Sequence, residues 1–305
     1  MGGSGKTPFT IYLADLLNRN GIRTAVSHRG YKSKLENTVT IVSNWNELLP
    51  VSDDAGDEAW LIAKRLTGIP VVVGKNRKQA ISLLCNTFPG LDCIILDDSF
   101  QHLKVIHNLD VIIISEWLKF GNGFVLPAGM LREPMSAISD SDILILNRIG
   151  GDGIINPDLS QQLYSTGKEM FSGRYISTGV YDFYGKEINI DEISGDTALL
   201  LAGVGNPSGF DLSVKALNIH NLGGIILNDH FDYSDTKARK SILESDQAKT
   251  AKWIITTEKD YAKLRHYQEF SEKLLVLRIN FMLDNGEEKL IAYVNNKLKG
   301  AEIPV

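Results

Sequence analysis

Residues 2–21 read GGSGKTPFTIYLADLLNRNG, and this stretch decides which fold to expect. Its glycines allow backbone N–H groups to turn toward phosphate oxygens, while the lysine and threonine can reach the phosphates of a nucleotide and a Mg²⁺ ion. Pro8 is accepted in the first turn of a helix, residues 9–17 supply an apolar face, and Gly21 is suited to end the helix. The stretch therefore predicts a phosphate-binding loop that opens a helix. The loop residues are Gly2, Gly3, Ser4, Gly5, Lys6 and Thr7.

The same letters have a second interpretation, because a flexible N-terminus is also rich in glycine and serine. The helix signal that follows directly favours the phosphate-binding loop. A loop of this kind needs a further glycine and a buried strand before Gly2, whereas the sequence begins at Met1. We therefore expect Met1 to take an internal position in a longer protein whose first strand lies upstream.

The composition is that of a globular protein. Of the 305 residues, 43% are hydrophobic, which is enough to bury one large core or two modest ones. The 32 basic and 37 acidic residues give a net charge of −5, which argues against a nucleic-acid partner. The two cysteines lack metal-like spacing. The sequence has no apolar run of about 18 residues, the length that would indicate a membrane span.

Short β-branched runs alternate with amphipathic segments of helix length along the chain. This pattern is typical of parallel sheets covered by helices on both faces. We predict an α/β fold, with a P-loop NTPase-type parallel-sheet domain and a second, smaller α/β domain. The expected strands are 23–27, 70–73, 92–96, 110–114 and 142–146 in the first series, and 198–202, 224–227 and 253–256 in the second.

The two strand series define the expected domains. We predict a nucleotide-binding and catalytic domain at residues 1–180, with its first strand missing upstream. An extended linker at 181–195 follows, and then the smaller domain at 196–288. Residues 289–305 form a C-terminal segment that we expect to pair with the linker.

Polar residues follow the predicted strands at the edge where open parallel sheets bind ligands. The recurrence of Arg, His and paired acids at this edge favours a shared site over ordinary loop solvation. These segments are 28–31, 74–77, 97–98, 116–134, 203–207, 228–230 and 257–260.

One of these segments ends an apolar strand in two carboxylates, Asp97 and Asp98. Acids in this place are often helix caps. Together with Lys6 and Thr7 they predict a Mg²⁺ site, in which Thr7, Asp97 and Asp98 orient the ion or its waters. Glu133 is a further candidate ligand.

Ten different short motifs follow one another along the chain. They are GGSGKTP at 2–8, RGY at 29–31, GDE at 56–58, DDSFQH at 97–102, GNG at 121–123, LPAG at 126–129, LREP at 131–134, GNP at 205–207, DH at 229–230 and TEKD at 257–260. By these motifs the chain resembles the tetraacyldisaccharide 4'-kinases of lipid A biosynthesis over nearly its whole length. That family usually has glycine at the position of Ser99, and an N-terminal apolar segment that helps hold it to the membrane.

The resemblance implies an activity. It implies transfer of the ATP γ-phosphate to the 4'-hydroxyl of a tetraacyldisaccharide 1-phosphate, with ATP and Mg²⁺ as cofactors, by a peripheral protein at the cytoplasmic face of the bacterial inner membrane. It also implies that Asp57 is the catalytic base, paired with His230. A carboxylate that accepts the hydroxyl proton suits such a weak nucleophile. Spacing alone would make Asp57 a helix N-terminal acid and His230 an ordinary loop histidine.

Three arginines, Arg29, Arg77 and Arg132, are candidates to clamp phosphate, because guanidinium presents a bidentate fork. We count Arg132 with Lys6 among the catalytic candidates, and we expect Gln101 and His102 to orient phosphate or water. Surface ion pairing is the alternative for all of these side chains.

Two other functions stay open at this point: a P-loop ATPase switch with a protein or membrane partner, and a P-loop kinase or ligase acting on a soluble metabolite. Segment 116–134 favours a lipid substrate, since it is apolar enough to touch a bilayer or acyl chains. A lid with its own small core is the alternative. The apolar residues are Trp117, Phe120, Phe124, Leu126 and Met130, flanked by Lys119 and Arg132.

Overall fold

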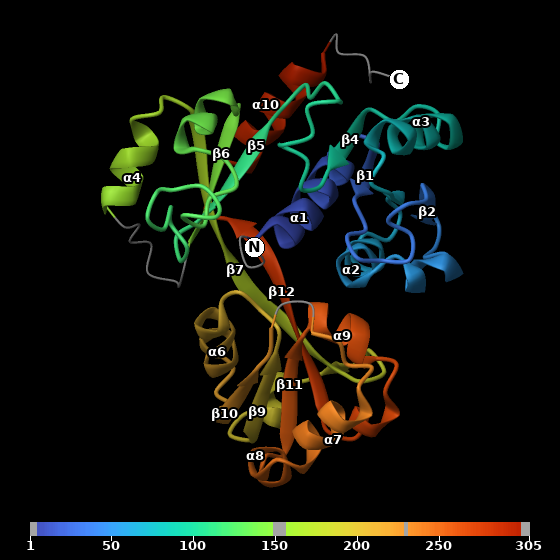
Figure 1. The fold of residues 1–305 in the computed structure, drawn as a ribbon, viewed down its shortest axis with the longest axis vertical. Helices are drawn as coiled ribbons and strands as arrows, with labels where there is room; N and C mark the ends of the chain where they lie inside the picture. Colours follow the sequence, from blue (N-terminus) through green and yellow to red (C-terminus); the bar gives the residue numbers. More distant parts are fainter. Residues whose placement is uncertain (1–4, 149–156, 229–230, 300–305) are drawn as a thin grey trace. The chain divides into compact units, whose positions relative to one another are not determined.

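The structure is a computed structural model that describes residues 5–148, 157–228 and 231–299. Of the predicted site residues, Gly2, Gly3, Ser4 and His230 lie outside the described residues. The described chain divides into two units (Figure 1). The larger contains residues 5–174 and 281–299, and the smaller contains residues 175–280.

The larger unit begins with α1 (Lys6–Arg19), the helix expected after the glycine-rich loop. Gly5 precedes it with a φ of 90°, a left-handed conformation that glycine adopts without steric cost. Gly21 follows it with a φ of 80°. The apolar face of the helix is buried, including Leu16 and Leu17. The predicted helix and its end are therefore confirmed.

The first sheet of the larger unit holds four strands in the order β2 (Thr40–Ser43), β3 (Val71–Val73), β1 (Thr24–His28) and β4 (Cys93–Leu96). Strands β1, β3 and β4 are parallel, and β2 runs antiparallel to β3. Helices α1, α2 (Asp57–Arg65) and α3 (Arg77–Thr87) contact these strands, and η1 (Pro50–Asp54) precedes α2. All five residues of β1 are buried, as expected for a parallel strand covered on both faces.

The remaining strands of this unit are β5 (Val111–Ser115), β6 (Ile143–Arg148) and the first part of β7 (Glu169–Asp182), all parallel. They are accompanied by η2 (Met135–Asp140), α4 (Pro157–Tyr164) and α10 (Glu287–Leu298). Two long strands, β7 and β12 (Leu274–Leu283), contribute residues to both units.

The smaller unit has a parallel sheet in the order β10 (His220–Ile226), β9 (Thr197–Ala202), β11 (Trp253–Thr257) and β12, and β8 (Glu187–Ile188) pairs antiparallel with β7. Alternate residues of β9 enter two separate apolar clusters. Leu200 packs with α6, whereas Leu199 packs with α7, α8 and α9. The predicted α/β fold with both faces covered is thus confirmed. The helices are α5 (Ile190–Ile193), α6 (Pro207–Lys215), α7 (Thr236–Glu244), α8 (Asp246–Thr250), α9 (Glu258–Leu264) and η3 (Gln268–Phe270).

One expectation about the C-terminal segment is corrected. Residues 289–298 lie in α10 instead of forming an extended segment that pairs with the linker. Leu290 and Val294, four residues apart, are the buried positions of this helix. A spacing of four places both side chains on one helical face, which explains why the segment is helical.

Asp284, directly after β12, binds residues of two other strands in the larger unit. Its Oδ1 accepts from Arg148 Nη2 at 2.6 Å and from Arg174 Nη1 at 2.9 Å, and its Oδ2 accepts from Ser172 Oγ at 2.7 Å. Burial raises the pKa of the Asp284 carboxyl, but the hydrogen bonds and the arginine charges outweigh burial and leave the pKa below its ordinary value. The ionised carboxylate therefore stabilises the fold.

We expect Asp284→Ala to lower the free energy of unfolding by about 3 kcal/mol at neutral pH, because it leaves the buried Arg148 charge without this partner. Since the folded pKa lies below the unfolded value, the contribution is present above about pH 4 and is lost as the pH falls through the folded pKa. Urea unfolding at several pH values measures both effects. Asp15→Ala, which breaks an exposed pair with Arg19 on α1, is the matched control and should cost less than about 0.5 kcal/mol. Equal losses in the two variants would contradict the assignment.

Candidate functional site

Lys6, the first residue of α1, faces Asp98, which follows β4. Lys6 Nζ lies 3.7 Å from Asp98 Oδ1, and Arg132 Nη1 donates to both carboxylate oxygens at 3.1 and 3.0 Å. Asp98 has a φ of 51°, a region that aspartate visits more readily than most residues. Burial raises the pKa of Asp98, but Lys6 and Arg132 outweigh it and lower the net pKa. An ionised carboxylate thus stands between two cations.

Asp97, one residue earlier, is almost fully buried, with 4% of its surface exposed. Its Oδ1 accepts from Thr10 Oγ1 of α1 at 2.9 Å. Its backbone N–H donates to the Ser27 carbonyl of β1 at 3.0 Å. The side chain and the main chain of Asp97 therefore connect the end of β4 to both α1 and β1.

Arg77 has a different place from the one predicted. Its side chain is buried, with Nη1 donating to Ser27 Oγ at 3.0 Å and Nη2 donating to the Asp97 carbonyl. Burial lowers the pKa of Arg77 to about 10. The guanidinium holds the ends of β1 and β4 together, which corrects its prediction as a phosphate clamp.

Arg29 lies at the surface and pairs with Glu36, its Nε 3.2 Å from Glu36 Oε1. Its guanidinium also lies over the Tyr31 ring, 5.7 Å from the ring centre. Ion pairing, the alternative considered for the arginines, therefore applies to Arg29 in this structure.

The acidic start of α2 lies close to Asp97. Asp57 and Glu58 are the first two residues of α2, after Gly56 with a φ of 88°. His28, at the end of β1, has its Nε2 3.6 Å from Glu58 Oε2 and 3.5 Å from Asp97 Oδ2. Glu58 of the GDE motif and Asp97 at the end of β4 are far apart in sequence, but both lie close to the His28 imidazole. The sequence pattern puts His28 directly after a predicted strand and indicates no role for it.

The segments that follow β4 and β5 also meet. Gln101 Nε2 donates to Glu133 Oε1 at 2.7 Å and to the Arg132 carbonyl at 3.4 Å. His102 Nδ1 is buried and has no hydrogen-bond partner among the described residues. The structure thus brings together Lys6, Asp98, Gln101, Arg132 and Glu133 from the predicted site.

Thr7, Asp97, Asp98 and Glu133 offer a hydroxyl and carboxylates, the oxygen donors that Mg²⁺ prefers, so the residues present fit this ion. In residues 5–148, 157–228 and 231–299, no three His, Cys, Asp or Glu side chains already converge as a metal cage.

In the smaller unit, Asp260 of the TEKD motif connects three segments that follow strands. Its Oδ2 accepts from the Gly203 N–H at 3.0 Å and from Thr257 Oγ1 at 2.8 Å, and its Oδ1 accepts from Tyr233 OH at 3.2 Å. Burial raises the pKa of this carboxyl. Thr257 caps α9 by accepting from the Asp260 N–H. These contacts give the motif a structural role at the carboxyl ends of these strands.

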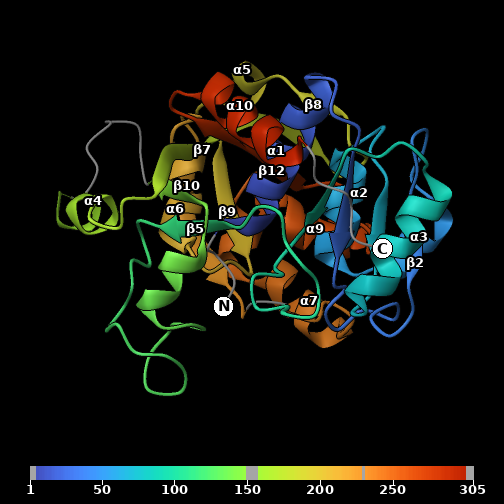
Figure 2. The ribbon, with the colours of Figure 1, turned by 90° about the horizontal axis from the view of Figure 1, so that it is seen from above.

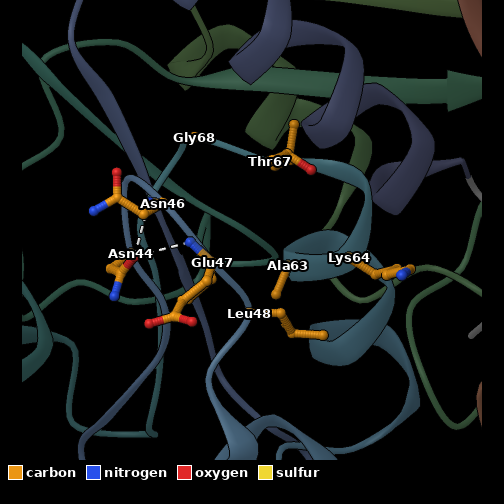
Figure 3. A pocket seen from close by; sticks show the side chains of 10 residues that line it. Asn44, Asn46, Glu47, Leu48, Ala63, Lys64, Thr67 and Gly68 are labelled. Atoms are coloured by element: carbon orange, nitrogen blue, oxygen red, sulfur yellow. Dashed lines mark hydrogen bonds between the residues drawn. The ribbon is translucent and has the colours of Figure 1, made fainter.

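A hollow of about 230 Å³ lies elsewhere in the larger unit (Figure 3). It is lined by ten residues from segments 43–48 and 63–68. Asn44 Oδ1 accepts there from the backbone N–H groups of Asn46 and Glu47 at 2.8 and 3.0 Å. These residues adjoin the C-terminal end of α2, roughly 12 Å along the helix from Asp57 at 1.5 Å per residue. None of the residues that line the hollow belongs to the predicted site.

Segment 116–134 runs as a long loop after β5 (green in Figure 2). Asn122 shapes it by donating to the Ala128 carbonyl at 2.9 Å and accepting from the Phe124 N–H at 3.2 Å. Phe120 was predicted to be among the apolar residues that could touch a bilayer. Instead it packs against the core that includes Ile114. The exposed large apolar residues of this loop, which we call the apolar surface, are Trp117, Phe124, Val125, Leu126 and Met130.

In the described part of the chain, none of the helices combines the length and the apolar character that crossing a bilayer requires.

Comparison with known proteins gives consistent results. The sequence model of one family, described as tetraacyldisaccharide-1-P 4'-kinase, matches residues 1–299. A tetraacyldisaccharide 4'-kinase of Desulfatibacillum aliphaticivorans is 31% identical over 311 residues, covering 99% of this chain and 82% of the relative. One from Chlorobaculum parvum is 33% identical over 310 residues, covering 97% and 84%. The crystal structure of "apo" form LpxK from Aquifex aeolicus in complex with ATP has a TM-score of 0.73 and 30% identity, covering 98% of this chain and 85% of that one.

Proposed function

This chain belongs to the tetraacyldisaccharide-1-P 4'-kinase family, and we propose that it transfers the γ-phosphate of ATP to the 4'-hydroxyl of a tetraacyldisaccharide 1-phosphate in lipid A biosynthesis. The observation that carries this function is the grouping of Lys6, Asp98 and Arg132 at the start of α1. A lysine at a glycine-rich helix start, opposed by the acid after a parallel strand, is the arrangement that phosphoryl transfer from a nucleotide requires.

Lys6 has the role of binding the β- and γ-phosphates. In the structure its ammonium lies 3.7 Å from Asp98, at the distance of an ion pair. Phosphate oxygens carry more negative charge than one carboxylate, so a nucleotide can draw Lys6 toward itself. Arg132 holds both oxygens of Asp98 and keeps that carboxylate in place.

Mg²⁺ is the second cofactor in this proposal, with Thr7, Asp97, Asp98 and Glu133 as the residues that would hold it. When bound, the ion neutralises charge on the phosphate oxygens. Gln101 fixes Glu133 through the 2.7 Å hydrogen bond, and Thr10 fixes one oxygen of Asp97. These contacts keep the donor oxygens oriented.

Asp57 is our candidate for the base. It accepts the proton of the 4'-hydroxyl while the new O–P bond forms and the bond between the β-phosphate oxygen and the γ-phosphorus breaks, releasing ADP. It lies in the first turn of α2, directly after Gly56. His230 is proposed as its partner on the strength of the family resemblance.

The membrane surface is the proposed partner, and the cytoplasmic face of the bacterial inner membrane the proposed location. A substrate with four acyl chains resides in a lipid phase, so the enzyme has to work at that boundary. The apolar surface supports this proposal, with Phe124 63% and Leu126 54% exposed on the loop that also carries Arg132. Exposed aromatic and aliphatic side chains insert into the headgroup boundary of a bilayer.

The activity itself is tested by incubating the protein with γ-labelled ATP, Mg²⁺ and a tetraacyldisaccharide 1-phosphate. We expect label in the lipid, and we expect Lys6→Ala to reduce transfer by roughly 100-fold or more with an unchanged thermal unfolding midpoint, because Lys6 faces phosphate and not the core. Lys240→Ala, at an exposed position on α7, is the control. Label released only as free phosphate would point to an ATPase, and normal transfer by Lys6→Ala would reject the phosphate-binding assignment.

Asp57→Asn should lower kcat by roughly two to four orders of magnitude and leave ATP binding nearly intact, since a base acts on the acceptor hydroxyl in the transition state. His230→Ala should behave alike. If the two residues act as a unit, the double variant should be far less impaired than the product of the single losses predicts. If Asp57→Asn mainly raised the KM for ATP, the role of Asp57 would be helix capping or metal binding and not that of the base.

Phe124→Glu combined with Leu126→Glu should weaken binding to vesicles of phosphatidylethanolamine and phosphatidylglycerol by about 100-fold or more, because each change removes about 1.5–3 kcal/mol of apolar burial and every 1.4 kcal/mol is tenfold. Vesicle co-sedimentation measures the loss. Leu212→Glu is the matched control, since Leu212 is 52% exposed on α6. An equal loss in the control, or none in the double variant, would reject the apolar surface as the contact.

A further inference from the structure

We propose that His28 is a positioning residue that orients the Asp97 carboxylate toward the metal and holds it beside the acidic start of α2. This inference rests on the proposed function for the identity of the metal–nucleotide complex, but the geometry that carries it involves only the chain's own residues. The imidazole stands between two carboxylates, with Nε2 at 3.5 Å from Asp97 Oδ2 and 3.6 Å from Glu58 Oε2.

The orientation of the ring is determined by the backbone. His28 Nδ1 lies 2.9 Å from the Gly30 N–H, which can only donate. Nδ1 therefore accepts, and the ring proton of neutral His28 must sit on Nε2, on the side of the two carboxylates. The ring thus presents an N–H to two groups that can only accept when ionised.

The turn that supplies this N–H does not tolerate a side chain. Gly30 has a φ of 70°, and a Cβ there would lie 2.3 Å from Val73 Cγ1 and 2.9 Å from Ser33 Oγ. The His28 carbonyl in turn accepts from the Gly74 N–H at 3.0 Å. Both the backbone and the ring of His28 are therefore held in place, and the side chain is buried, with 6% of the residue exposed.

The position between two carboxylates has an electrostatic meaning. Ionised Asp97 and Glu58 repel each other, and Asp97 is too buried for water to screen that repulsion fully. Both distances exceed the usual hydrogen-bond range of about 2.7–3.2 Å, so His28 acts on the two carboxylates as a nearly equidistant electrostatic neighbour and not as a committed donor to either. Thr10 binds the other oxygen of Asp97. Together Thr10 and His28 set the plane of the carboxylate that would hold the metal.

Outer-shell partners of metal ligands typically change metal affinity by about 10- to 100-fold when they are removed. We therefore expect His28→Ala to weaken Mn²⁺ binding about tenfold in the presence of a non-hydrolysable ATP analogue, followed by electron paramagnetic resonance of free Mn²⁺. Binding of the analogue without metal should stay unchanged. His28→Gln, which can place an amide N–H near the Nε2 position, should recover most of the affinity.

The matched control is His107→Ala. His107 is also largely buried and also pairs with a carboxylate, with Nδ1 2.8 Å from Asp110 Oδ1, but none of its contacts reaches Asp97 or Glu58. We expect its metal affinity to equal that of the unchanged protein. Equal metal affinity in His28→Ala and the unchanged protein, or an equal loss in His107→Ala, would overturn the role of His28. If His28→Ala fails to fold, His28→Leu serves in its place, and a leucine variant with full metal affinity would overturn it equally.

The metal readout needs no lipid. If the unchanged protein binds Mn²⁺ and analogue but labels no lipid, the proposed function fails while the role of His28 is still decided by the variants. If lipid is labelled and His28→Ala retains both metal affinity and rate, the function stands and this inference fails.

Discussion

The larger unit depends on a single constraint, the burial of the Asp97 carboxylate at the end of β4. A charge removed from water is tolerated only when protein dipoles or opposite charges replace the lost hydration. Here Thr10 of α1 donates to the carboxylate, and His28 of β1 lies 3.5 Å from it. Arg77 of α3 donates to the Asp97 carbonyl and adds a nearby positive charge. The contacts of this one residue therefore fix where α1, β1 and α3 meet the end of β4. Because Lys6 and Thr10 both belong to α1, the contact of Thr10 with Asp97 also places Lys6 close to Asp98.

The neighbouring acids differ in what surrounds them, which separates their tasks. Asp98 is half-exposed and stands between Lys6 and Arg132, so it can exchange partners when phosphate arrives. Asp97 is buried and has rigid partners, which suits a group that must keep one orientation. At the end of β4, Asp98 therefore has contacts that a phosphate can replace, whereas Asp97 has contacts that stay fixed. A single aspartate at this position could not have both properties.

Much of this was predictable, and the failures have physical reasons. The buried strands and α1 follow from apolar runs and helix end signals, and the meeting of Lys6 with Asp98 follows from the rule that ligands bind beyond the carboxyl ends of parallel strands. Arg77 was misassigned because its residue type suits phosphate, whereas its burial is visible only in three dimensions. The long β7 was missed because most of its residues are half-buried and give no regular alternation. His28 gave no signal beyond its place at a strand end, since its role arises from contacts with Glu58 and Asp97, 30 and 69 positions away.

The assignment of residues 281–299 to the larger unit has a consequence for synthesis on the ribosome. The chain emerges from its N-terminus, so the strands of the four-stranded sheet appear early, but Asp284 and α10 appear only after the whole smaller unit. Asp284 is the acceptor for Arg148 and Arg174. Until translation passes that point, the nascent larger unit carries two guanidinium groups without their carboxylate and lacks its last helix. The smaller unit needs no described residue beyond 280, so it can fold before the larger unit is complete.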